Sequence, residues 1–189
     1  MKKRNPANLL ARECIATALI QLANQKPFSA ITVSELTQRA GVSRMTFYRN
    51  YTSKEDVFKS YLEDLTAAYR EEICRNGPPE TFGEYEILCH CFRYFEIYQD
   101  FISCLLHIGM GELLLNALSS HLTESYYTGK APDTGLYYAL QAYAGALYNI
   151  YITWLKSGMK EPAEAMAGIV YRLVAAQKKQ IFSLQAKNT

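Results

Sequence analysis

Residues 32–54, which read TVSELTQRAGVSRMTFYRNYTSK, constrain the fold more than any other stretch of the chain. Thr32 is a favourable helix N-cap, and Glu35 three residues later completes a capping box. Gly41 stands where this short helix must end, and glycine readily adopts the left-handed conformation of that position. Ser43 can then cap a second helix. The pattern predicts two short helices that cross at a large angle, as in a helix-turn-helix.

The second of these helices is predicted to have an inward apolar face and an outward polar face. At about 100° per residue, Phe47 and Tyr51 point the same way, with Val42 beneath them. Met45 and Arg49 point almost opposite, and the outward face contains no acidic residue. Arginine can donate two hydrogen bonds to guanine, and hydroxyl groups suit phosphate oxygens. This face is therefore predicted to contact DNA; the alternative is an ordinary solvated surface, which would more often mix Lys with Glu.

The charge distribution agrees with a nucleic-acid contact at one end of the chain. Residues 1–60 carry ten Lys and Arg against four Asp and Glu, whereas the remainder carries ten against fourteen. A basic first third on an acidic remainder is typical of a protein that docks one end on nucleic acid. The N-terminal segment MKKRNPANLL lacks an apolar run of signal-peptide length. We interpret it as a basic arm on the DNA backbone or minor groove, or as a tail that only aids solubility.

The same residues resemble the TetR family of bacterial transcription regulators, over about residues 9–60. The positions that carry the resemblance are Thr32, Ala40-Gly41-Val42-Ser43, Thr46, Tyr48, Tyr51 and Ser53-Lys54-Glu55-Asp56. The resemblance implies that Thr46, Tyr48 and Lys54 hold phosphates and that the start of the helix after Ser43 reads bases. Two residues depart from the family pattern: Asn50 stands where histidine is common, and Tyr51 where phenylalanine is common.

Asn50 can still donate to a phosphate, and Tyr51 can still fill the core. The residues predicted to contact DNA are therefore Thr32, Ser43, Arg44, Met45, Thr46, Tyr48, Arg49, Asn50 and Lys54.

The chain of 189 residues is predicted to be all-α, with a three-helix head and a helical body, about nine helices in all. No segment alternates with period two, so no sheet is expected. The clearest break is Asn76-Gly77-Pro78-Pro79, and residues 128–133 form a second predicted loop. We expect a DNA-binding domain at residues 1–53 and an effector-binding and dimerisation domain at residues 54–189.

Five cysteines, an odd number without a secretory signal, favour the cytoplasm and free thiols. Cys89-His90-Cys91 invites a metal site, but residues i and i+2 of a helix point about 200° apart, and no second ligand pair has zinc spacing. We expect neither metal nor cofactor, and a redox-sensing cysteine remains an alternative. Residues 134–155 are uncharged, yet several tyrosines make them too polar for a membrane span. They are interpreted as a helix buried in protein.

Aromatic side chains crowd two regions of the body. Ligand pockets are mostly apolar with a few polar groups, so these residues could line a cavity, although each one alone could simply be core. An unidentified small-molecule effector, planar and apolar or cationic, would suit such walls. The predicted pocket residues are Phe92, Phe95, His107, Tyr143 and Trp154.

The last two predicted helices, about residues 134–157 and 161–184, have broad apolar faces. The family resemblance implies that these helices from two copies form a four-helix dimer interface. The predicted interface residues are Leu140, Leu147, Tyr151, Ile169 and Leu173. A two-fold dimer presents two reading helices and selects a palindromic operator. The run WLKSGMKEP also resembles a C-terminal type found among regulators of the dihydroxyacetone kinase branch.

The sequence therefore predicts a homodimeric, ligand-responsive regulator that binds double-stranded DNA, with repression as the favoured activity. The alternative keeps the fold but acts as a co-regulator through a partner protein. An enzyme is disfavoured, because the sequence has no Gly-rich phosphate loop and no nucleophile elbow.

Overall fold

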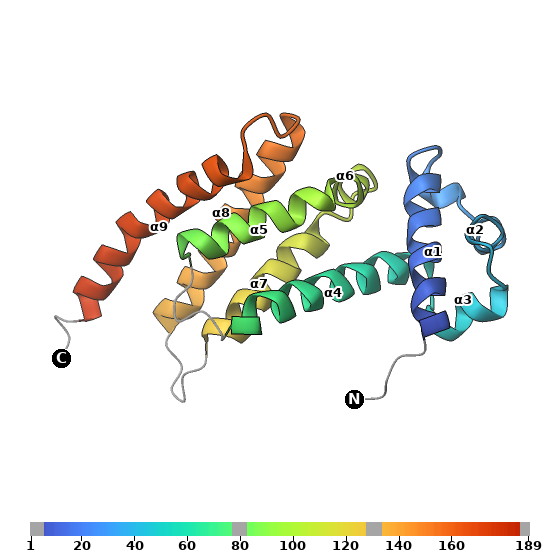
Figure 1. Cartoon of the computed structure of the whole chain (residues 1–189), viewed down its shortest axis with the longest axis horizontal. Coiled ribbons are helices and arrows are strands. Elements are labelled where there is room, and N and C mark those ends of the chain that lie inside the picture. The colour runs from blue at the N-terminus through green and yellow to red at the C-terminus, as the bar shows by residue number, and fades with distance from the viewer. Residues whose placement is uncertain (1–5, 77–82, 128–133, 186–189) are drawn as a thin grey trace. The chain divides into compact units, whose positions relative to one another are not determined.

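The computed structural model describes residues 6–76, 83–127 and 134–185, and its regular structure is entirely helical (Figure 1). Nine α-helices and no strand occur in these ranges, which confirms the predicted all-α class. They are α1 (Pro6–Ala23), α2 (Val33–Ala40), α3 (Arg44–Asn50), α4 (Lys54–Ile73), α5 (Tyr85–Ile97), α6 (Gln99–His107), α7 (Glu112–Tyr126), α8 (Thr134–Lys156) and α9 (Ala163–Gln185). The break at Gly77-Pro78-Pro79, the loop at 128–133 and the arm at 1–5 lie outside the described residues.

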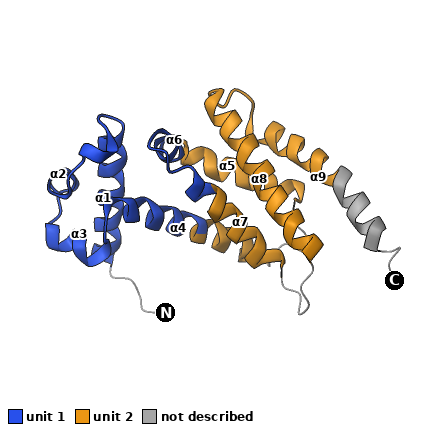
Figure 2. Cartoon of the chain, turned by 180° about the vertical axis from the view of Figure 1, so that it is seen from behind, with its two compact units in different colours: residues 1–66, 100–114 blue, residues 67–99, 115–189 orange. Residues whose placement is uncertain are grey.

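The chain divides into two compact units (Figure 2). Unit 1 comprises residues 1–66 and 100–114, and unit 2 comprises residues 67–99 and 115–189. Unit 1 therefore contains more than the predicted three-helix head, because the first part of α4 and nearly all of α6 pack with it. Phe101 of α6 lies with its ring edge against Tyr61 of α4 at 4.8 Å between centroids. The functional boundary after residue 53 stays a prediction.

Unit 1 is built on the buried faces of its first three helices. Ile15 and Leu19 of α1, Leu36 of α2 and Phe47 of α3 are each 0% exposed. The three helices contact one another, and Figure 1 shows α2 and α3 on the same side of α1. Removing such a side chain from water stabilises the fold by about 1.5–3 kcal/mol.

The start of α2 is fixed by the predicted capping box. The Thr32 hydroxyl accepts a hydrogen bond from the backbone N–H of Glu35 at 3.2 Å. The Glu35 carboxylate in turn receives hydrogen bonds from Lys26 and from the backbone of Thr32, and these lower the pKa of Glu35. Two N–H groups that the first turn would leave unpaired are satisfied in this way.

The end of α2 is fixed by Gly41, whose φ of +67° lies in the left-handed region. Its N–H donates to the carbonyl of Gln38, and the N–H of Val42 donates to the carbonyl of Thr37 at 3.0 Å. These two bonds form a Schellman motif, which satisfies the last carbonyls of the helix. The predicted left-handed turn is confirmed, and it redirects the chain into α3.

The guanidinium of Arg12 ties α1 to the later elements of unit 1. Its Nε donates to the hydroxyl of Tyr51 at 3.3 Å, and its Nη2 donates to Ser60 and pairs with Asp64, both at 2.6 Å. The Arg12 side chain is only 13% exposed. Burial is the main cause that raises the pKa of Tyr51, so the hydroxyl stays protonated. The tyrosine that departs from the family pattern thus has a structural hydrogen bond.

Unit 2 is built on α5, α8 and α9. α5 packs along α9, and Phe92 of α5 meets Trp154 of α8 edge to face at 5.6 Å. The indole of Trp154 donates to the carbonyl of Glu161 at 2.9 Å, which ties the end of α8 to the turn before α9. Gly158 in that turn has a φ of +81°. Within the described ranges, no helix has the length and apolarity needed to cross a bilayer.

We expect Arg12→Leu to lower the free energy of unfolding by about 1–3 kcal/mol, because Tyr51, Ser60 and Asp64 lose a shared donor at a mostly buried position. Urea denaturation measures this change. Arg39→Leu is the matched control, since Arg39 is exposed and should change the free energy by less than about 0.5 kcal/mol. Equal losses in the two variants would contradict a structural role for Arg12.

Candidate nucleic-acid interface

α3 is held in place by its first residues and by its apolar face. The Ser43 hydroxyl accepts a hydrogen bond from the backbone N–H of Thr46 at 3.0 Å, as an N-cap does. Phe47 is 0% exposed and Tyr51 is 4% exposed, and their rings meet at 5.7 Å. The predicted inward face of the helix is confirmed. The remaining side chains of α3 must therefore face outward or lie along the edges of the core.

The outward face of α3 has the composition that base and phosphate contacts need. Arg44 and Arg49 are exposed, and Met45 and Tyr48 are 83% and 55% exposed. No Asp or Glu occurs between Ser43 and Thr52, so the field of the two guanidinium groups is not cancelled locally. α3 is short enough to enter a major groove, which admits one α-helix. Contacts of these residues with DNA remain predictions.

The polar side chains at the edges of α3 are partly engaged within the protein. The amide nitrogen of Asn50 donates to the Thr46 carbonyl at 2.8 Å, which leaves one of its two N–H groups for a phosphate. The hydroxyls of Ser43 and Thr46 lie 3.0 Å apart. Thr32 lies at the start of α2, where its hydroxyl serves as the cap described above. Each of these residues therefore has a local structural role, and the predicted phosphate contact would be a second role.

Lys54 has a structural role that the sequence analysis missed. Its ammonium donates to the carbonyls of Phe28, Ser29 and Ile31, the last two at 3.3 and 3.0 Å. It also lies 4.6 Å from the centroid of the Phe28 ring, as a cation–π contact. An ammonium has three donors, so each one has an acceptor in this structure. A phosphate contact by Lys54 stays a prediction, and it requires Lys54 to share or exchange one of these carbonyls.

The predicted pocket residues fall into two different parts of the chain. Phe92, Phe95, Tyr143 and Trp154 are buried in unit 2, each 8% exposed or less. His107 ends α6 in unit 1 and is exposed. The structure therefore groups the four aromatic residues and not the histidine. That these four residues line an effector-binding pocket remains a prediction.

A polar cluster around the buried side chain of Tyr69 in unit 2 was not predicted. The ring of Tyr69 stacks on His90 at 5.5 Å and meets His121 edge-on at 5.6 Å. The Tyr69 hydroxyl and the Cys91 thiol share a hydrogen bond, and burial raises the pKa of Cys91 to about 11. His90 Nε2 and His121 Nδ1 have no hydrogen-bond partner among the described residues, although His90 Nε2 lies 3.8 Å from the Glu72 carboxylate. We call Tyr69, His90, Cys91 and His121 the Tyr69 cluster.

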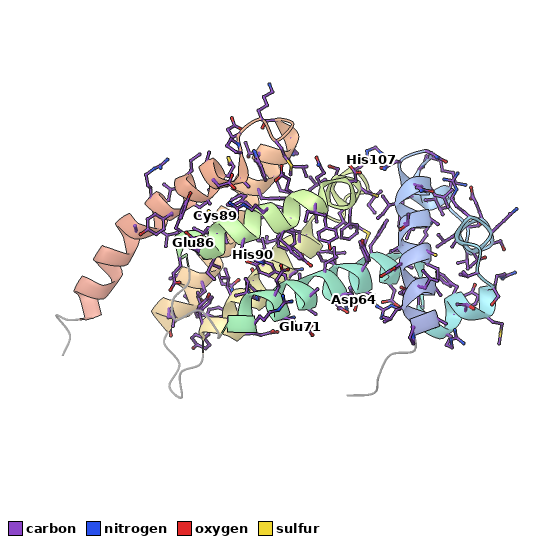
Figure 3. All side chains as sticks on the ribbon, in the orientation of Figure 1. Asp64, Glu71, Glu86, Cys89, His90 and His107 are labelled. Atoms are coloured by element: carbon purple, nitrogen blue, oxygen red, sulfur yellow. The ribbon has the colours of Figure 1, made fainter. Side chains whose placement is uncertain are left out.

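The Tyr69 cluster combines residues from three helices, so only part of it had a sequence signal. His90 attracted attention through Cys89-His90-Cys91, and Figure 3 shows Cys89 and His90 on α5. The side chains that the structure describes contain no group of three or more His, Cys, Asp or Glu that could hold a metal ion. Burial, with a further contribution from Arg70, lowers the pKa of His121, so this ring is neutral near pH 7.

The predicted dimer interface needs a correction. Leu140, Leu147 and Tyr151 are 0%, 7% and 7% exposed, because α8 turns them into the interior of unit 2. A second copy cannot reach these side chains. Ile169 and Leu173 of α9 are 38% and 55% exposed and remain available.

Comparison with known proteins agrees with this geometry. The family model described as "Bacterial regulatory proteins, tetR family" matches residues 15–61, and the model "Transcriptional regulator C-terminal region" matches residues 84–176. An uncharacterized HTH-type transcriptional regulator, YxbF from Bacillus subtilis, is 26% identical over 73 residues. That match covers 38% of this chain and only 19% of the relative, so the chain spans about a fifth of its length.

Solved structures of similar fold cover nearly the whole chain. The dihydroxyacetone kinase operon activator DhaS has a TM-score of 0.64 at 19% identity, over 90% of this chain and 97% of its own. A TetR transcriptional regulator from Streptococcus agalactiae has a TM-score of 0.59 at 24% identity, over 89% and 95%. The Bacillus subtilis regulator FadR in complex with stearoyl-CoA has a TM-score of 0.51 at 20% identity, over 85% and 96%.

The two model matches together span the head and most of the body, and the similar folds extend over both. The chain belongs to the tetR family of bacterial transcriptional regulators, whose members bind DNA through a helix-turn-helix.

We expect Lys54→Met to lower the free energy of unfolding by about 1–2 kcal/mol, since three carbonyls lose a charged donor. Urea denaturation without DNA measures this effect. Lys59→Met removes an exposed lysine from the same helix and should leave the free energy within about 0.5 kcal/mol of wild type. If Lys54→Met leaves the free energy of unfolding unchanged, the contacts of Lys54 with the three carbonyls do not contribute to stability.

We also expect stability to fall as the pH is lowered from 7.5 to 5.5, partly through His121. The unfolded chain takes up a proton there near the ordinary histidine pKa of about 6.5, whereas the folded chain resists protonation until a lower pH. His121→Gln should therefore show a shallower loss of unfolding free energy over this range than wild type. Ser120→Ala, an exposed neighbour on α7, should keep the wild-type slope. If the unfolding free energy of His121→Gln falls with pH as steeply as that of wild type, His121 does not contribute to the pH dependence.

Proposed function

We propose that the chain is a ligand-responsive, DNA-binding transcriptional regulator that binds a palindromic operator as a homodimer and represses transcription. The observation that carries this proposal is the outward face of α3, which exposes two arginines and no acid on a helix whose start and inner face are fixed. Arginine is the side chain that most often reads guanine in the major groove.

The charge of the chain supports the same assignment. The excess of basic residues lies within residues 1–60, which include α1, α2 and α3, and the rest of the chain is net acidic. Attraction to phosphates then acts mainly on the head and favours its approach to a duplex.

The exposed faces of α8 and α9 support a homodimer. On α9, Ala165, Ile169 and Leu173 recur at four-residue spacing and are all exposed. On α8, Ala142 and Ala146 are exposed, and their small side chains permit close approach of another helix. We assign these residues to the interface in place of the buried α8 residues. Two-fold symmetry would then present two copies of α3 to two half-sites about 34 Å apart.

The Tyr69 cluster supports an effector site in unit 2. His121 Nδ1 has no hydrogen-bond partner among the described residues, and the nearest partner of His90 Nε2 is the Glu72 carboxylate at 3.8 Å, beyond hydrogen-bond length. A ligand that supplies a hydrogen bond to either nitrogen would remove the cost of leaving it unpaired. Aromatic side chains such as Phe95, whose ring lies 5.6 Å from that of Tyr69, surround the cluster and suit an apolar portion. The FadR structure holds stearoyl-CoA, a ligand with both polar and apolar parts. We propose an amphipathic effector of this general kind.

The proposed response is a population shift. Residues 54–73 form one helix, α4, whose first part belongs to unit 1 and whose last part belongs to unit 2. A ligand that favours one spacing of the two reading helices would reduce the affinity for an operator with another spacing. A coupling of about 1–3 kcal/mol changes that affinity about 5- to 150-fold.

One observation favours the alternative of a co-regulator that acts through a partner protein. A groove of about 650 Å³ on α5 and α9 has exposed Tyr85 and Tyr171 in its lining, with their rings 5.9 Å apart. Exposed tyrosines are common in protein interfaces. If this function holds, the purified chain will show sequence-specific DNA binding only when the partner is present.

The test of direct DNA reading starts from duplexes selected by the purified protein from a random-sequence pool. Arg49→Ala should lose about 1–3 kcal/mol of preference for the selected duplex over a scrambled one, because a bidentate base contact is removed. Lys54→Ala should weaken both duplexes to a similar degree, since a phosphate contact is present on every sequence. Gel-shift titrations measure both ratios, at a temperature where each variant is folded.

Equal losses of Arg49→Ala on selected and scrambled duplexes would contradict base reading by Arg49. Failure to select any duplex in the absence of other proteins would favour the co-regulator alternative.

A further inference from the structure

Met45 is the most exposed large hydrophobic residue among those whose side chains the structure describes, at 83%. It is the second residue of α3 and lies on the same helix face as Arg49, four residues later. Packing within the protein does not explain why position 45 is a methionine, because the side chain makes almost no contact with the rest of the chain. A charged or hydroxyl side chain would be better solvated there. The position therefore exposes an apolar group on the face that we assign to the base edges.

The chemistry of the thioether limits what Met45 can read. Methionine has no hydrogen-bond donor, and its sulfur is a weak acceptor. It cannot replace arginine at the acceptor atoms O6 and N7 of guanine, and it gains little from the amino groups of adenine and cytosine. The major groove presents one apolar group on an unmodified base edge, the C5-methyl group of thymine. Contact with that methyl removes apolar surface from water on both sides.

We propose that Met45 is a specificity residue that selects thymine in each operator half-site through its C5-methyl group. This inference rests on the proposed DNA-binding function and names the base that one side chain reads. Arg49 lies about 6 Å farther along the helix axis, at about 1.5 Å per residue, so its contact with DNA is distinct from that of Met45.

The test replaces thymine by deoxyuridine, which keeps every hydrogen-bonding atom of the base and removes only the methyl group. Each thymine of a duplex selected from a random pool is replaced in turn, in both half-sites together. For wild-type protein, one replacement should weaken binding about fourfold per half-site, the ratio that corresponds to about 0.8 kcal/mol for one buried methyl-sized group. Gel-shift or fluorescence-anisotropy titration measures the affinities.

Two variants assign the effect to the side chain. Met45→Ala should bind the thymine and deoxyuridine duplexes equally, because it lacks the group that covers the methyl. Met45→Leu should keep most of the wild-type discrimination, since leucine retains an apolar side chain of similar size. Ile97→Ala is the matched control, because it removes another exposed apolar side chain, 76% exposed at the end of α5, and it should keep the wild-type ratio. Because Met45 is exposed, neither substitution at this position should change the thermal unfolding midpoint.

Three results would overturn the inference. A wild-type protein that selects a duplex but tolerates deoxyuridine at every thymine leaves the proposed function intact and removes the role of Met45. A deoxyuridine effect that persists in Met45→Ala assigns the methyl contact to another residue. A protein with no sequence preference for any duplex overturns both this inference and the proposed function.

Discussion

The left-handed turn at Gly41 is the constraint on which the candidate interface depends. It ends α2 through two backbone hydrogen bonds and places Ser43 where it can cap α3. A Cβ at Gly41 would meet nothing within 4 Å, so the requirement for glycine comes from the backbone conformation and not from crowding. Because α3 starts at Arg44 and packs Phe47 into the core, the helical period directs Met45 and Arg49 outward.

The Arg12 network of unit 1 and the Tyr69 cluster of unit 2 are two groups of polar side chains with different surroundings. In unit 1, the guanidinium of Arg12 is mostly buried and has oxygen partners on Tyr51, Ser60 and Asp64. A satisfied network of this kind favours one rigid arrangement of the helices. In unit 2, His121 Nδ1 of the Tyr69 cluster has no hydrogen-bond partner among the described residues, and His90 Nε2 has only the Glu72 carboxylate at 3.8 Å. A ligand that hydrogen-bonds to these imidazole nitrogens would stabilise them, which is consistent with the proposed effector site at the cluster.

Features that depend on neighbouring residues were predictable from the sequence, and those that depend on distant residues were not. The capping box at Thr32 and the turn at Gly41 need only residues a few positions apart, and both were predicted. The carbonyls that Lys54 meets lie 23 to 26 positions earlier, and no local pattern signals them. Helical spacing showed that α8 has a broad apolar face. It could not show whether that face packs against helices of the same chain or against a second copy. Leu140 and Tyr151 were therefore assigned to the wrong surface.

The central claim is that the outward face of α3 meets a DNA duplex, and the salt dependence of binding tests it most directly. A protein that neutralises phosphates releases counterions, so the logarithm of its affinity falls linearly with the logarithm of salt concentration, by about 0.9 for each phosphate. We predict such a decline for purified protein on duplex DNA, and a shallower decline for Arg44→Ala/Arg49→Ala. Binding that is absent at low salt, or that does not change with salt, would contradict the account.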